Sequence, residues 1–151
     1  MASNSKREQL LVKVKEVLEG LDSISYVDRK PLQGISELQT YPNTQIPLAA
    51  VLGSMPVPEE KYSGRSRKLD VVRSTLDINI IVYIMDNETP DTTISTIADD
   101  IWVALYDDLT LGFDWVLSMR LIPDVDTAVW TPYAAFSIVC QMLYLHDKTG
   151  I

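Results

Sequence analysis

The segment Ser74–Asp86, with the sequence STLDINIIVYIMD, constrains the fold more than any other part of the chain. Strict alternation of apolar residues predicts a β-strand with one buried face. The side chains of that face are Leu76, Ile78, Ile80, Val82 and Ile84. The opposite face begins polar and becomes apolar at Ile81, Tyr83 and Met85. Some other element must therefore cover part of the second face.

Two helices and four further strands are predicted around this segment. Apolar residues recur at helical spacing over about Lys6–Glu19 and about Pro90–Asp107. In the second helix the apolar stripe includes Trp102 and Leu109. The other strands are expected at about Ile24–Asp28, Pro47–Gly53, Trp115–Ile122 and Pro132–Leu145, and the long central strand at about Asp70 to Asp86.

Residues suited to helix ends support both helices. Ser5 and Glu8 form a capping box, and Gly20 is well placed to end the first helix. Thr89 can cap the second helix, and Pro90 fits its first position.

The order α-β-β-β-α-β-β predicts an α+β fold in which a mixed, mainly antiparallel sheet of four to five strands carries both helices on one face. We expect one domain over residues 1–151, with an extended flexible hairpin arm at about residues 54–69. Two helices leave the other face of the sheet bare, and the last strand is apolar on both sides. Either copies of the chain cover that face, or the long segment Arg29–Gln45 folds over it.

Composition limits the classes of function. The chain has 13 basic and 21 acidic residues among 151 and a net charge of −8, which disfavours broad adhesion to nucleic acid. Its single cysteine, Cys140, lies in an apolar run and is expected to be a buried structural thiol. The beginning lacks an apolar signal core, and no apolar run approaches the roughly 18 residues of a membrane span. We expect a soluble protein made in a reducing cytoplasm.

No catalytic, metal or cofactor motif is present in the sequence. The glycines form no phosphate-binding loop. Asp124 and Asp126 lie in a turn without the pattern of a calcium loop, and His146 is the only histidine. We expect His146 to be an exposed residue at the end of a strand, and we expect no enzyme activity and no cofactor.

The candidate interface residues come from charge and aromatic content. A basic cluster in the arm contains Arg65, Arg67 and Lys68, with Arg73 beyond it, and could dock an acidic partner or form a solvated loop. Tyr83 lies on the second apolar face of the central strand. Trp130 and Tyr133 near the second turn could anchor an interface or pack on the end of the sheet.

The arrangement of these elements resembles that of bacteriophage tail terminator (tail completion) proteins. The resemblance covers most of the chain and concerns order and length, without a short invariant motif. Its parts are the amphipathic SKREQLLVKVKEVLEGL, the strand IPLAAVLGS, the strand STLDINIIVYIMD, the helix TPDTTISTIADDIWVALYDD, the segment LGFDWVLSMRLIPDVDT and the closing strand TPYAAFSIVCQMLYL. The segment around Arg29–Gln45 departs from the family outline.

The resemblance implies a structural protein of the virion tail, assembled in the host cytoplasm. Members of that family form a ring, typically a hexamer, which caps the tail tube, ends its polymerisation and offers the surface to which the head joins. The implied partners are further copies of the chain, the tail tube protein and the head-tail connector, with DNA passing through the lumen without specific binding. Two alternatives stay open, namely another phage neck or connector component, and a small α+β enzyme or ligand-binding module whose first suspects are Asp124, Asp126 and His146.

Overall fold

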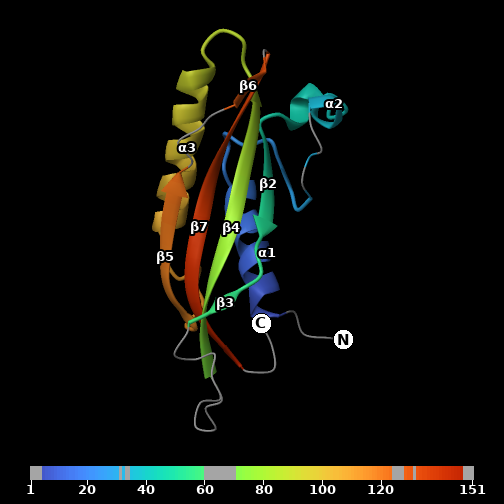
Figure 1. Cartoon of the computed structure of the whole chain (residues 1–151). Coiled ribbons are helices and arrows are strands. Elements are labelled where there is room, and N and C mark those ends of the chain that lie inside the picture. Colours follow the sequence, from blue (N-terminus) through green and yellow to red (C-terminus); the bar gives the residue numbers. More distant parts are fainter. Residues whose placement is uncertain are drawn as a thin grey trace.

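The computed structural model describes residues 5–30, 32, 35–59, 71–123, 128–130 and 132–147 (Figure 1). The helices are α1 (Lys6–Glu19), α2 (Ile35–Leu38) and α3 (Pro90–Tyr106), with a 3-10 turn η1 (Asn43–Gln45). The strands are β1 (Tyr26–Asp28), β2 (Leu48–Gly53), β3 (Val57–Pro58), β4 (Val71–Met85), β5 (Val116–Pro123), β6 (Ala128–Trp130) and β7 (Tyr133–Asp147).

These strands form one mixed sheet, which confirms the predicted α+β class. The strand order is β1-β2-β4-β7-β5, with β3 beside β4 and β6 beside β7. Only β1 and β2 pair in parallel; the other pairs are antiparallel. The five strands of the main order match the five predicted strands, whereas α2, β3 and β6 were not predicted. Of the expected arm at 54–69, β3 belongs to the sheet, and residues 60–69 lie outside the described residues.

A two-stranded ladder of β4 and β7 is the longest feature of the sheet. Fifteen consecutive pairs run without a register shift from Val71↔Asp147 to Met85↔Tyr133. At roughly 3.4 Å per residue this ladder extends about 50 Å. By contrast, β5 meets β7 with a bulge between Val116 and Ser118.

Helices α1 and α3 cover one face of the sheet (Figure 1). Leu10, Leu11 and Val14 of α1 and Ile97 and Ile101 of α3 pack against the alternate buried residues of β4 and β7 in a single core. The prediction for α3 was wrong at its margins. Trp102 is 38% exposed although Ile101 and Leu105 beside it in α3 are fully buried, and Leu109, which is 44% exposed, lies beyond the end of the helix.

The helix ends differ in part from the predicted caps. The Glu8 N–H donates to Ser5 Oγ at 3.1 Å, as the capping box requires, but the Glu8 carboxylate accepts from Arg29. Gly20 ends α1 without adopting the left-handed conformation. Thr89 makes no side-chain cap, so that prediction was wrong. Asp86 instead fixes the turn that precedes α3: it accepts from the N–H groups of Glu88 and Thr89 and from the Thr93 hydroxyl at 2.6 Å.

The Asp86 carboxylate is expected to stabilise the fold in a pH-dependent way. Its hydrogen bonds, that from Thr93 first, lower its pKa from 3.8 to about 2. The stabilisation is therefore complete above pH 3.8 and disappears as the pH falls through about 2. Denaturant unfolding of Asp86→Asn and the parent protein should show a stability difference at pH 5 that vanishes near pH 2. A difference that is constant with pH would contradict this assignment.

Candidate interaction surface on the open side of the sheet

The described residues cover only part of the face of the sheet opposite α1 and α3. We call its uncovered part the open face. Its half-buried apolar side chains are Leu52 of β2, Ile81 of β4, Ile122 of β5 and Val139 and Leu143 of β7. They lie side by side across four strands, because Leu52 pairs with Asn79, and Ile122 pairs with Val139.

Polar side chains alternate with these apolar ones on the open face. Gln141 Nε2 donates to Asp77 Oδ1 at 3.1 Å across the β4–β7 ladder. Arg120 and Asn79 are exposed on the neighbouring strands. An apolar strip interrupted by satisfied polar groups can stay in water in a free subunit and still be buried in an assembly.

The segment around α2 and η1 covers one end of this side of the sheet. Leu48 and Ala50 of β2 share the face of Ile81 and Tyr83, and both are fully buried. Leu38 of α2 and Ile46 are buried too, outside the main core. Burial first, and then the carboxylate of Glu37 in α2, raise the pKa of Tyr83. Of the two alternatives for the second face, cover by the segment Arg29–Gln45 therefore applies to the end at Tyr83, and the described residues leave the open face uncovered.

The residues singled out in the sequence do not form one site. Arg65, Arg67 and Lys68 lie outside the described residues. Arg73 pairs with Glu59, which follows β3. Tyr83 lies ten residues farther along β4, roughly 34 Å away. Tyr133 is half-buried at the beginning of β7 and pairs with Trp130, whose side chain lies outside the description.

A second exposed apolar surface lies on α3. Trp102 and Tyr106 have ring centroids 5.0 Å apart, and the neighbouring Val103 is 61% exposed. The helical periodicity placed Trp102 in the core, and only the contacts of α3 with the sheet reveal that it faces outward. Trp102, Val103 and Tyr106 belong to α3, which packs on the face of the sheet opposite to the open face.

His146 is buried, which corrects the expectation of an exposed strand end. It is 6% exposed, and its ring stands 5.4 Å from that of Tyr144. Its Nε2 lies 2.6 Å from Ser74 Oγ, and its Nδ1 lies 2.8 Å from the Asp147 carbonyl oxygen. His146 lies on the same face of β7 as the buried residues Met142 and Tyr144, because alternate residues of a strand share a face.

This Ser–His pair has the spacing of a nucleophile and its base, but its surroundings do not provide for catalysis. A backbone carbonyl takes the place of the orienting carboxylate. Ser74 is fully buried, and two pockets beside α1 are lined by neither residue. Asp124 and Asp126 lie outside the described residues, and Pro123 before them pairs with Ile138, eight positions along β7 from His146.

A Ser74→Ala variant should be less stable by about 1 kcal/mol, because it loses one hydrogen bond between strands in the core. Denaturant unfolding measures this difference. An activated-serine reagent such as a fluorophosphonate should not label Ser74 in the native protein. Stoichiometric labelling that Ser74→Ala abolishes would instead identify a working nucleophile.

Other candidate groups are structural. Burial raises the pKa of the Cys140 thiol to about 12, in agreement with the predicted buried thiol. Within the described ranges, no three His, Cys, Asp or Glu side chains gather in a way that could hold a metal ion. Among the helices described, none is long and apolar enough to cross a membrane.

Comparisons with known proteins identify no family. No family model matches the chain, and no curated protein matches it. Among solved structures, a chain of the "Virion of native gene transfer agent (GTA) particle" is similar over 94% of this chain and 96% of its own length, with 10% identity and a TM-score of 0.48. A similarity of this extent carries no argument about function, which must rest on the surfaces of the molecule.

Proposed function

We propose that this chain is a structural subunit of a bacteriophage tail and that its copies form a ring capping the tail tube. The observation that carries the proposal is the open face, where Ile81, Val139 and Leu143 lie half-exposed in the middle of the sheet with no element of the described chain over them. The order of the elements resembles that of tail terminator proteins, and for this reason we propose a ring on the tail tube as the assembly.

The positions of the two exposed surfaces favour a ring over a symmetric dimer. The open face and the α3 surface of Trp102, Val103 and Tyr106 differ in composition and lie on opposite sides of the sheet. When unlike surfaces of successive copies meet, the contact is head-to-tail, and such contacts close into a ring if the rotation allows. Arg120 on the open face and the aspartates of α3, including Asp99, are charges of opposite sign for that contact.

The remaining surfaces of the ring would meet the tail tube protein on one side and the head-tail connector on the other. A lumen formed by a chain of net charge −8 lets DNA pass, because surfaces of like charge do not bind. The subunit would be assembled in the host cytoplasm and reside in the virion. Geometry and self-association, not catalysis, would perform the function.

Light scattering after size exclusion tests the proposal, with the protein alone and with the tube protein of the same phage. We expect a closed oligomer, for a hexamer six times the 17.0 kDa of the chain, and rings in negative-stain images. A protein that remains monomeric in both conditions, without rings on the tube ends, would refute it.

A further inference from the structure

Two segments at the edges of the sheet are blocked by side chains from the helices. On the β2–β3 side, the guanidinium of Arg7 in α1 donates to the carbonyl oxygens of Gly53 at 2.8 Å and Ser54 at 2.9 Å. On the opposite side, the N–H of Leu121 in β5 donates to the hydroxyl of Tyr106 at 3.2 Å. These groups are the ones that an added strand would need, so both edge segments resist strand pairing.

The edge strand β1 has no such block among the described residues. β1 ends the strand order, and its one neighbour is β2. The Tyr26 N–H donates to Pro47 on the β2 side, and backbone groups alternate in direction along a parallel strand. The N–H and C=O of Val27 therefore point to the outer edge.

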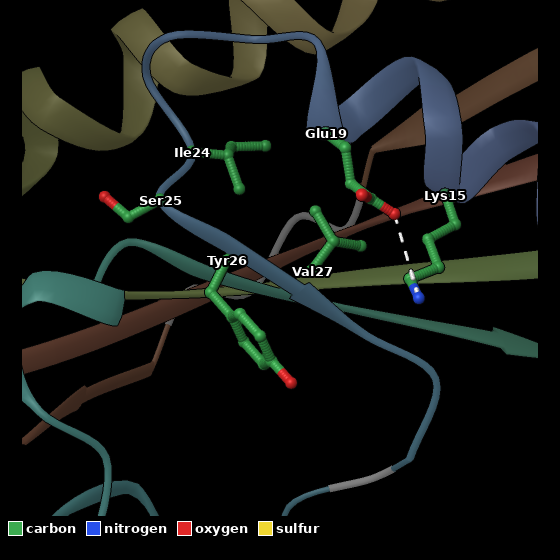
Figure 2. A pocket seen from close by; sticks show the side chains of 6 residues that line it. All are labelled: Lys15, Glu19, Ile24, Ser25, Tyr26 and Val27. Atoms are coloured by element: carbon green, nitrogen blue, oxygen red, sulfur yellow. Dashed lines mark ion pairs between the residues drawn. The ribbon is translucent and has the colours of Figure 1, made fainter.

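A crevice lies along this edge of β1. It measures about 250 Å³ and is lined by Lys15 and Glu19 of α1 and by residues 24–27. In Figure 2 the side chain of Val27 lies on the α1 side of the strand, towards Glu19, while Tyr26 points to the other side. Lys15 Nζ and Glu19 Oε1 stand 3.7 Å apart at the rim. The crevice thus combines unpaired backbone groups with an apolar floor of Ile24 and Val27, each 6% exposed.

We infer that the outer edge of β1 binds an extended segment of a partner chain by strand addition, with an aliphatic side chain of that segment in the crevice. Backbone N–H and C=O groups at an open edge are recognised by another strand, and the adjacent pocket selects alternate side chains. The mixed charge of the Lys15–Glu19 rim favours an uncharged segment.

Another folded copy of this chain is the less suitable occupant. Its edge segments at Gly53–Ser54 and at Leu121 are blocked, and two β1 strands would join only three residues each, which makes a short contact. An extended segment of another chain is the better match to this edge. The inference concerns a different surface from the open face and does not depend on ring formation.

Suitable probes are uncharged heptapeptides of alternating threonine and valine, which form strands readily. Their central residue is alanine, valine, leucine or phenylalanine. Amide NMR of the full-length protein titrated to millimolar peptide should show saturable shifts confined to residues 24–28 and the facing part of α1. Hydrogen exchange at the Val27 amide should slow at least tenfold. Peptides with valine or leucine at the central position should bind more tightly than the peptide with alanine there.

N-methylated peptides supply a control that leaves the protein unchanged. Methylation of alternate amides on one edge of the peptide should weaken binding at least tenfold, and methylation on the other edge should not. In the protein, Val27→Pro removes the outward N–H and should abolish the shifts, with the protection of β2 amides reporting that the sheet persists.

Three results would overturn the inference. The first is that no peptide binds. The second is that methylation of either edge of the peptide weakens binding equally. The third is that protection of the Val27 amide rises with protein concentration when no peptide is present. The last result would identify a β1–β1 dimer as the occupant. If Val27→Pro fails to fold, the methylated peptides alone decide.

Discussion

A protein with Val139 replaced by aspartate is expected to fold normally and to lose ring assembly. Val139 lies in the middle of the open face, half-buried beside Ile122, so water can hydrate a carboxylate there in the free subunit. In the ring, the same carboxylate would be buried against a neighbour without a matched partner, which costs several kcal/mol at each contact. Because a closed ring repeats that contact around its circumference, we expect only monomer by light scattering.

The control for this experiment is Thr44→Asp. Thr44 is exposed in η1, away from the open face, and the substitution adds the same charge to the chain. Both variants should retain the circular dichroism of the parent, and Thr44→Asp should also retain its rings. If Val139→Asp assembles as the control does, the open face is not the contact between copies.

Replacing Leu11 by alanine should destabilise the fold by about 2–5 kcal/mol, because it removes a fully buried side chain and leaves a cavity between α1 and β2. The contact is close at Gly53. A Cβ at this position would stand 2.8 Å and 2.9 Å from the two Leu11 methyl carbons and 3.0 Å from Arg7 Nη2. Gly53→Ala in the parent should therefore cost about 1–3 kcal/mol by overpacking.

The double variant distinguishes this contact from general damage to the core. Once Leu11 is alanine, the methyl groups that the new Cβ would meet are absent, so Gly53→Ala should cost clearly less in that background. We expect a coupling of about 0.5–3 kcal/mol from denaturant unfolding of the four proteins. Additive effects would show that Gly53 is required for another reason, such as the Arg7 bonds to this edge.

The sequence predicted those elements whose burial follows a regular period. The bounds of α1 were predicted to the residue, and α3 ended one residue earlier than expected, because each has a long apolar stripe opposite a polar face. The strand Ser74–Asp86 was recognised from strict alternation. Its pairing with β7 was not predicted, because α3 and β5 lie between the two strands in the sequence.

The predictions failed where a residue's environment comes from distant parts of the chain. Trp102 fits the helical stripe by spacing, but α3 presents it to water. His146 is buried, and its hydrogen-bond partner Ser74 lies seventy-two positions earlier in the sequence. Helix α2 has four residues, too few for any period to be recognised.

The candidate site shows the same limit. Tyr83 was correctly placed on the second face, but its cover by α2 depends on a loop path that local patterns do not encode. Arg73 was grouped with the basic arm, whereas its partner Glu59 follows β3 and neutralises it. Blocking of the edges by Arg7 and Tyr106 depends on how the helices lean over the sheet, which only the structure reveals.

The unbroken β4–β7 ladder makes the subunit a stiff rod rather than a hinge. Strands bend sharply at bulges, and the fifteen consecutive pairs of this ladder contain none. A force applied where β4 begins, at Val71, therefore tilts the opposite end, at Met85 and Tyr133, by the same angle. In a closed ring of such subunits, a partner that binds at one end of the β4–β7 ladders would change the orientation of their other ends in all subunits together.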